Sequence, residues 1–441
     1  MLDLISVFFF LSQLLAVGVG FFLLKRFKRS IGAGLTLIFI LYFIYNFFVP
    51  GVDVLLSINS FFGFRFTNNQ ILSFTQGSVY SFGLLSIVCG YCIFYSFTNF
   101  SRKENFDITL DFKNGIIYLL IIIQMLVWIL VIVNIISSGI SLVNIFDFST
   151  SNEADLLFST SWKYPFIDML SNCLPVCLFL QFKFSKKINW ILVFLFSFWL
   201  FISLLSGWRY RIILFFLFIV VDFLILKKWS FIRIFLGALF LSISLSWLTL
   251  NRMAIAKRQF HLITFDLSLF DVRIFATEFS NSRTFKATLI YLDSHPEIKA
   301  LGPGSWLRFL ENKGKPKRDF PNFERPKPWI LEVTKVWIPP GWPWNPNPAV
   351  TQMEEFFLTF GWIGLLIGMF AVGFWVGFLD VLVKDPVFQS FKVVGIALLF
   401  QWTTRGFFLY QLQITIVCFL PFLLLWLAKP YLSHVSAANK A

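Results

Sequence analysis

Long apolar runs alternate with short polar segments along the chain, a pattern typical of a polytopic membrane protein. A bilayer core needs about 20 apolar residues per helix. The windows that meet this requirement are 4–24, 31–49, 79–99, 115–137, 165–182, 188–206, 211–226, 231–249, 356–380, 391–404 and 407–428. We therefore predict about eleven transmembrane helices, among which the fifth and the tenth windows are short.

The composition agrees with this pattern. Hydrophobic residues make up 58% of the 441 residues and charged residues only 14%. Soluble domains carry about 25% charged residues, so this chain lacks the polar surface of one. The predicted fold class is therefore an all-α polytopic membrane protein. The net charge of +14 is assigned to the basic flanks of membrane spans, so no nucleic-acid partner is expected.

Lysine and arginine are concentrated in alternate connections between the predicted helices. These connections are 25–30, 100–114, 183–187, 227–230, 381–390 and the C-terminal tail. Cytoplasmic loops carry the excess of positive charge, so we predict an outer N-terminus and a cytoplasmic C-terminus. The long segment 250–350 does not enter the count, because long loops translocate largely regardless of charge.

The long segment divides the chain into three parts. Residues 1–249 hold eight predicted helices, residues 250–355 form one large outer loop, and residues 356–441 hold three helices and a tail. The first half of the loop, Asp266 to Tyr291, mixes apolar and polar residues as amphipathic helices lying on the bilayer do. Nine of the 17 prolines follow between Pro316 and Pro348, which predicts an extended segment rather than regular helix.

Metal and nucleotide chemistry is not indicated by any motif. The chain has three histidines and no HExxH pair, Walker loop or GxSxG sequence. The first outer loop offers only Asp53, whereas a metal-dependent lipid-sugar transferase would need paired acids. The five cysteines all lie in apolar segments. We therefore predict neither a metal nor a cofactor.

Arginines mark the predicted outer turns, where the topology rule disfavours them. Arg209 and Arg211 stand in the turn 206–211, and Arg405 precedes Gly406 in the last outer turn. Guanidinium groups bind phosphate bidentately, and glycine lets backbone amides approach an anion. Such a cluster suits a pyrophosphate leaving group, although each arginine alone also fits a side chain that snorkels to lipid phosphates. The further candidates for substrate binding are Arg252, Arg258, Arg273, Arg283, Trp208 and Tyr210.

Carboxylates and one histidine are the candidate general bases on the outer face. They are Glu354, Glu355, Glu278 and His295. Either glutamate of the adjacent pair could instead cap a helix N-terminus, and His295 could be a surface turn residue. Trp342 and Trp344 suit the apolar faces of sugar rings but equally suit an interfacial belt.

Together these motifs resemble the bacterial O-antigen polymerases (Wzy-type), or oligosaccharide repeat unit polymerases. The motifs are 206–211 opening a span, His295-Pro296 with Gly302–Ser305 in the large loop, Asn347-Pro348, the helix start Glu354–Gly364, and Arg405-Gly406. Their order and the single outer loop cover most of the chain. O-antigen ligases share part of the pattern but usually carry a His-Asn pair where this chain has Asn345–Pro348, which favours a polymerase.

The resemblance implies a metal-free glycosyltransferase of the bacterial inner membrane whose active site faces the periplasm. An undecaprenyl-diphosphate-linked oligosaccharide would donate its glycan to a sugar hydroxyl of a second lipid-linked repeat unit. The leaving diphosphate needs positive charge and the hydroxyl needs a base. The first role falls to Arg209, Arg211 and Arg405, with Arg252 and Arg283 as further members. The second falls to Glu354 or Glu355, then to Glu278 or His295.

The implied partners are the lipid-linked oligosaccharide, membrane lipid, a chain-length regulator and a flippase. Two alternatives remain open. An O-antigen ligase, or another lipid-linked glycosyltransferase, would make a single transfer to a different acceptor. A flippase or transporter of lipid-linked oligosaccharide would need a polar pathway, which the scarcity of charge inside the predicted helices disfavours.

Overall fold

The computed structural model describes the chain in fourteen ranges: 4–27, 32–55, 60–61, 64–66, 69–97, 110–137, 165–185, 190–205, 209–225, 281–314, 329–336, 350–381, 386–404 and 407–438. The chain divides into two compact units. Unit 1 comprises Met1–Ser101, Val272–Leu382 and Leu399–Gln411, and unit 2 comprises Arg102–Asp271, Val383–Leu398 and Leu412–Ala441.

The described residues of unit 1 are helical apart from one short hairpin. Its elements in chain order are α1 (Leu4–Arg26), α2 (Ala33–Tyr42), the π-helical segment η1 (Phe43–Phe48), α3 (Val49–Leu55), β1 (Ser60–Phe61), β2 (Phe64–Arg65), α4 (Asn69–Phe97), α15 (Asn281–Ser294), α16 (Pro296–Ala300), α17 (Gly302–Gly314), α18 (Trp329–Val336) and α19 (Gln352–Val381). The strands β1 and β2 pair antiparallel.

Unit 2 is helical throughout the residues that are described. Its own elements are α5 (Leu110–Ser137), α8 (Pro165–Leu170), α9 (Cys173–Phe184), α10 (Trp190–Leu205) and α11 (Arg209–Ile225). Two further helices, α20 (Pro386–Thr404) and α21 (Phe408–Ala438), contribute residues to both units.

Six described segments are long and apolar enough to cross a membrane. They are Val7–Arg26, Ala33–Leu55, Ile71–Ser96, Gly115–Asn134, Gln352–Val381 and Gln411–Ala428. The chain is therefore an all-α protein with several candidate transmembrane helices, as its sequence predicts. The predicted window 231–249 lies outside the described ranges, and the number of eleven spans and their sidedness stay predictions.

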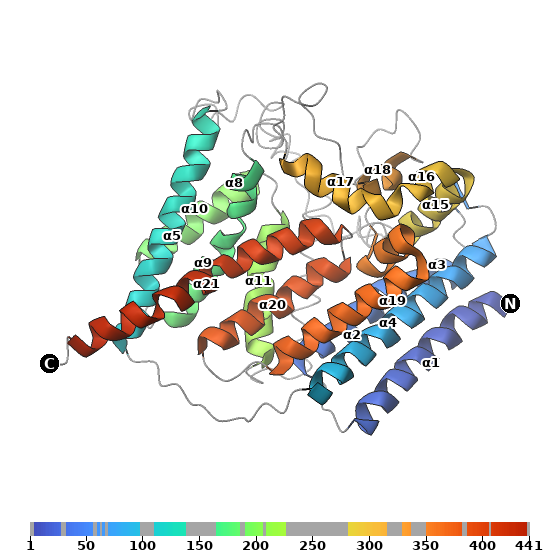
Figure 1. The fold of residues 1–441 in the computed structure, drawn as a ribbon, viewed down its shortest axis with the longest axis horizontal. Helices are drawn as coiled ribbons and strands as arrows, with labels where there is room; N and C mark the ends of the chain where they lie inside the picture. Colours follow the sequence, from blue (N-terminus) through green and yellow to red (C-terminus); the bar gives the residue numbers. More distant parts are fainter. Residues whose placement is uncertain are drawn as a thin grey trace, which may run out of the picture. The chain divides into compact units, whose positions relative to one another are not determined.

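The centre of unit 1 is the helix α4, which packs against α1 and α19 (Figure 1). Its contact with α19 is a backbone contact through two glycines. A Cβ atom at Gly90 would lie 2.1 Å from the carbonyl oxygen of Phe370, and one at Gly373 would lie 1.9 Å from that of Ile87. Small residues of this kind allow membrane helices to approach closely, so the two glycines fix the crossing of α4 and α19.

The start of α2 is held by an acid from the end of α19. The Asp380 carboxylate accepts the backbone N–H groups of Gly34 at 3.0 Å and of Leu35 at 3.3 Å. A carboxylate at a helix N-terminus satisfies unpaired amides and is favoured by the helix dipole. Asp380 therefore stabilises the fold and needs no catalytic explanation.

In unit 2, the predicted span 165–182 is interrupted. Helix α8 ends at Leu170 and α9 begins at Cys173. Pro175 has no N–H to donate to the carbonyl of Ser171, and Leu174 N donates to that carbonyl instead, at 3.2 Å. The Asn172 amide donates to the Met169 carbonyl at 2.8 Å, which replaces another helical contact. The proline and the asparagine together break the helix.

Two predictions about the large loop are wrong. Helix α15 does not lie on the bilayer as an amphipathic surface helix, because residues 281–289 are all buried. Ser282, Arg283 and Lys286 bind partners on other elements of unit 1, so the polar spacing does not mark a solvent face. The proline-rich segment also contains a regular helix, α18, because no proline occurs between Pro328 and Pro339.

Candidate functional site

Arg209 and Arg211 are the predicted phosphate-binding arginines of unit 2, and the structure describes the side chain of Arg211. Arg211 lies in the first turn of α11 and is 1% exposed. Its Nε donates a hydrogen bond of 3.0 Å to the Asn172 side-chain oxygen at the break between α8 and α9. Arg209 begins the same helix. Two arginines thus enter the first turn of one helix.

Asn172 fixes the orientation of this arginine. Its own amide NH₂ donates to the Met169 carbonyl, so the amide oxygen must face Arg211. The backbone oxygen of Asn172 accepts the Cys418 thiol at 3.5 Å. Asn172 is 1% exposed, which places the helix break inside unit 2. Broken helices in membrane proteins are tolerated where they are buried in protein or line a site.

The placement of Arg209 and Arg211 is electrostatically unusual. A helix N-terminus carries a partial positive charge, so it favours anions and disfavours cations. The acidic residues that commonly occupy a first turn are absent from the described start of α11. Two arginines at this position are unfavourable for the helix alone. They become favourable if an anion binds there, since the helix N-terminus and the guanidinium groups then act together.

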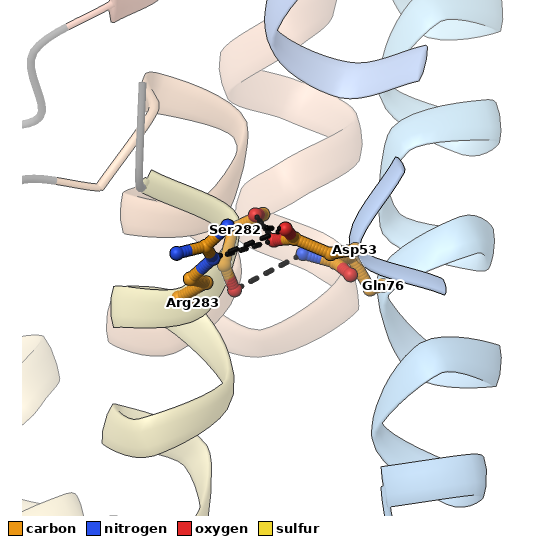
Figure 2. Close-up of polar contacts among 4 residues, drawn as sticks. All are labelled: Asp53, Gln76, Ser282 and Arg283. Carbon is orange, nitrogen blue, oxygen red and sulfur yellow. Dashed lines mark hydrogen bonds and ion pairs between the residues drawn. The ribbon is translucent and has the colours of Figure 1, made fainter. Parts of the chain in front are cut away.

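Arg283 in unit 1 is engaged differently. Its Nη2 lies 2.6 Å from one oxygen of Asp53, and its Nε lies 3.0 and 3.1 Å from the two Asp53 oxygens (Figure 2). The Ser282 hydroxyl donates to the same carboxylate at 3.0 Å. Both charges are buried, with side chains 10% and 4% exposed. The pair joins α15 to α3.

Lys286 lies one turn beyond Arg283 on α15. Its ammonium donates to the Ser73 hydroxyl at 3.0 Å. Burial lowers the pKa of Lys286, the Asp53 carboxylate opposes this shift and the nearby Arg283 adds to it, so that the resulting pKa is about 8. Lys286 is therefore a second buried basic group beside the ion pair.

A chain of hydrogen bonds runs from the ion pair to α19. The Gln76 amide donates to the Ser282 carbonyl at 3.2 Å and to the Tyr80 hydroxyl at 2.9 Å (Figure 2 draws the first of these contacts). Tyr80 in turn donates a short hydrogen bond to Glu354 Oε1. The network therefore connects α15, α4 and α19, and it brings Arg283 and Glu354, two of the predicted site residues, into one system.

Glu354 forms a capping box with Thr351. Its Oε2 accepts the Thr351 N–H at 2.5 Å, and its own N–H donates to the Thr351 hydroxyl at 3.4 Å. This reciprocal arrangement satisfies two amides at the start of α19. Both carboxylate oxygens of Glu354 are therefore in use, which supports the capping interpretation that its sequence position left open.

Glu355 holds a different segment. One of its oxygens, Oε2, accepts the backbone N–H groups of Phe407 at 2.5 Å and of Phe408 at 2.7 Å. Phe407 has a φ of 96°, which is rare for a residue with a side chain. The carboxylate thus fixes a strained turn at the start of α21, immediately after the motif Arg405-Gly406.

The remaining described candidate, His295, is a turn residue. It precedes the first turn of α16, its Nδ1 lies 2.9 Å from the Tyr291 carbonyl oxygen, and its ring stacks on that of Tyr291. Several predicted site residues lie outside the described ranges: Arg405, Glu278, Arg252, Arg258, Arg273, Trp208, Trp342 and Trp344. For Arg209 and Tyr210 only the backbone is described.

Sequence reasoning missed the neutral residues of these sites. Asn172 and Tyr80 stand in predicted apolar windows and Gln76 stands three residues before one, so an amide or a hydroxyl there is easily taken for a packing residue. A polar side chain inside a membrane span is itself a signal, because its burial is costly without a partner. In the described part of the chain, no group of three metal-ligating side chains is present.

Comparisons with known proteins add no further identification. No family model, no curated protein and no solved structure matches the chain. The function is therefore argued from the side chains and their contacts.

Proposed function

We propose that the chain is a metal-independent glycosyltransferase that polymerises undecaprenyl-diphosphate-linked oligosaccharide repeat units. In this proposal it spans the bacterial inner membrane about eleven times, with its N-terminus in the periplasm and its C-terminus in the cytoplasm. The site faces the periplasm. A chain-length regulator and a flippase are its proposed protein partners.

One observation carries the proposal. Arg211 is buried in the first turn of α11, where the helix dipole disfavours a cation, and it is held there by Asn172 at a helix break. Asn172 contacts the Nε edge of the guanidinium and so fixes its plane, whereas a phosphate group is bound bidentately through guanidinium N–H groups. A diphosphate leaving group is the anion that this arrangement suits.

The proposed reaction is a displacement at an anomeric carbon. The acceptor hydroxyl loses its proton to a base and attacks the anomeric carbon, while the bond to the diphosphate oxygen breaks and its electron pair stays on that oxygen. Arg211, together with Arg209 in the same first turn of α11, stabilises the negative charge that develops there. Preorganised donors of this kind each contribute about 10²–10³-fold in rate.

Reconstitution tests the proposal. The purified protein in detergent receives lipid-diphosphate-linked repeat units as its only substrate, with a chelator present, and the products are separated on a gel. A ladder spaced by one repeat unit is expected from the wild type, and Arg211→Ala should shorten the ladder to the starting unit while the variant stays folded. If folded wild-type protein yields no ladder from the correct repeat unit, the chain is not a polymerase. Single transfer to a lipid acceptor would then identify a ligase.

A further inference from the structure

Two adjacent glutamates at the start of α19 differ in how their oxygens are used. Glu354 uses both, one with Tyr80 and one with Thr351. Glu355 uses Oε2 for the amides of Phe407 and Phe408, and its Oε1 has no hydrogen-bond partner within the described ranges. Glu355 is fully buried. The two acids are equivalent in the sequence. In the structure, both carboxylate oxygens of Glu354 accept hydrogen bonds, whereas only one oxygen of Glu355 does so within the described ranges.

The Glu355 oxygen belongs to a polar stripe. Gln352, Glu355 and Thr359 are spaced by three and four residues, so they share one face of the helix. All three are buried, with exposures of 2%, 0% and 3%. Among the residues described, both amide atoms of Gln352 and the Thr359 hydroxyl also have no partner.

Unpartnered polar groups on one buried face require an explanation. Each one destabilises the folded protein if nothing completes its hydrogen bonds. Buried polar groups in native proteins are usually completed by a protein partner, a water or a ligand. The stripe offers an acceptor oxygen, an amide that both donates and accepts, and a hydroxyl that does the same. This set matches the neighbouring hydroxyl groups of a sugar.

Aromatic rings adjoin the stripe. Phe408, whose amide is held by Glu355, lies 5.3 Å from Trp306 and 5.3 Å from Phe356 between ring centroids. The Trp306 and Phe408 rings are stacked. Sugar rings pack their apolar C–H faces on such side chains while their hydroxyl groups bind polar neighbours. The backbone leaves the helical conformation at Gly361, with φ 67°, two residues after Thr359, so the stripe occupies a short helical end before a kink.

We propose that Gln352, Glu355 and Thr359 form the binding site for the acceptor sugar, and that Glu355 is the general base. This inference rests on the proposed glycosyl transfer and specifies its acceptor side. Glu355 Oε1 takes the proton of the acceptor hydroxyl. The hydroxyl oxygen forms the new glycosidic bond to the anomeric carbon, and the lipid diphosphate departs with the electrons of the broken bond. The protonated Glu355 then returns its proton to water. Gln352 and Thr359 bind the neighbouring hydroxyl groups and orient the nucleophile.

The contact to Phe407 and Phe408 contributes to this role. Two amides on Oε2 hold the carboxylate in one orientation, so that Oε1 faces a fixed direction. General bases need such positioning within hydrogen-bond reach of the proton they accept. The same contact would explain why Glu355 rather than Glu354 performs the chemistry.

Glu355→Gln separates anchoring from proton transfer. The glutamine carbonyl can still accept the two amides, but the second position becomes an NH₂ group that takes no proton. We expect a thermal midpoint close to that of the wild type and a loss of about 10²–10⁴-fold in the elongation rate. Glu354→Gln, the isosteric change at the neighbouring residue, should lower the rate less than tenfold. If Glu355→Gln elongates within threefold of wild type, whereas Glu355→Ala does not, Glu355 only anchors the turn and the proposal fails.

The acceptor site is tested without catalysis by direct binding. The probe is the lipid-free oligosaccharide released by mild acid from the lipid-linked repeat unit, titrated into the full-length protein and followed by tryptophan fluorescence. Gln352→Leu and Thr359→Val should weaken its binding at least fivefold each, and in turnover they should raise the acceptor KM more than they lower kcat. Thr334→Val, a buried threonine of α18, is the matched control. Unchanged binding in both stripe variants would overturn the acceptor site even if the wild type polymerises. A wild type that binds the oligosaccharide but makes no ladder would refute the polymerase and retain the sugar site.

Discussion

Two buried arginines donate hydrogen bonds to different kinds of acceptor. In unit 1, Arg283 meets the Asp53 carboxylate through Nε and Nη2, so that the positive charge is matched by a negative one. In unit 2, the Nε of Arg211 donates to the side-chain oxygen of Asn172, a neutral amide, at the start of α11. The contact in unit 1 places a carboxylate against its arginine, whereas the contact in unit 2 orients a guanidinium in the first turn of a helix.

This difference assigns different functions to two residues that the sequence grouped together. A neutralised arginine attracts no diphosphate, but it ties α15 to α3 and therefore serves the fold. Arg211 stands at a helix N-terminus, where the helix dipole and the guanidinium both favour an anion such as a phosphate. We infer that Arg283 serves the fold and that Arg211 is the better candidate for the leaving group, while the substrate-binding role of Arg283 stays a prediction from the sequence.

The largest expected effect is a loss of folding stability when the ion pair between Asp53 and Arg283 is broken. Asp53→Ala leaves Arg283 buried beside Lys286 with its charge partner removed. Breaking one side of a buried ion pair costs about 3–5 kcal/mol, so the free energy of unfolding should fall by that amount. Denaturant titration of the protein in detergent measures it.

The double variant Asp53→Leu/Arg283→Leu is the control for that result. It removes both charges together, so it should be more stable than Asp53→Ala, because the Arg283 guanidinium is not left buried without its carboxylate. Equal destabilisation in both proteins would mean that packing, not charge, explains the effect of Asp53.

The next largest expected effect is the contribution of Lys286 to folding stability, which depends on pH. The folded protein lowers the pKa of Lys286 from 10.5 to about 8. Between these values the unfolded chain binds a proton that the folded protein has released, so stability rises with pH across the window from about 8 to 10.5. Below pH 8 the penalty for the buried charge is constant. A shift of this size corresponds to about 3 kcal/mol at full burial.

The comparison with Lys286→Met isolates this contribution from other titrating groups. The variant should be more stable than the wild type below pH 8, and its advantage should shrink toward pH 10.5. Lys299→Met, at an exposed ion pair with Asp293, should show no such change. A stability difference between wild type and Lys286→Met that is independent of pH would contradict the lowered pKa.

Much of the fold follows from sequence, whereas the pairing of its polar groups does not. Long apolar windows locate α1, α4, α5 and α19, because a span must satisfy its own backbone hydrogen bonds as a helix. The break before Cys173 was missed, although Pro175 and Asn172 both oppose helix there. The burial of α15 was also missed, since amphipathic spacing cannot tell a solvent face from a face with internal partners. Which acid meets which arginine depends on contacts such as that between Asp53 and Arg283, which are distant in the sequence.

Substitution of arginine by lysine tests the difference between Arg211 and Arg283 through the elongation rate. Arg211→Lys keeps the charge but loses the planar fork and its Nε contact with Asn172. The elongation rate should fall about 10²-fold, in line with the loss of one preorganised donor. The gel ladder of the reconstituted protein, timed at several intervals, measures this rate.

The same substitution at the other arginine is the matched control. Arg283→Lys should lower the free energy of unfolding, because the lysine cannot reproduce the contacts with Asp53, while elongation stays within about fivefold of wild type. If Arg283→Lys slowed elongation as much as Arg211→Lys, the proposed separation between a structural and a catalytic arginine would be wrong.

The smallest expected effect concerns the helix start to which the Arg283 network leads. Thr351→Ala removes the hydroxyl that accepts the Glu354 N–H, and loss of an N-terminal cap costs about 1 kcal/mol. Elongation should change less than threefold, because the carboxylate of Glu354 still meets the N–H of residue 351 and the Tyr80 hydroxyl, while Glu355 still holds the amides of Phe407 and Phe408. Four contacts therefore keep the first turn of α19 in place after the fifth is lost. A tenfold slower elongation at nearly unchanged stability would show that the cap itself tunes the chemistry, and it would move Glu354 and Thr351 from the structural network into the reacting site.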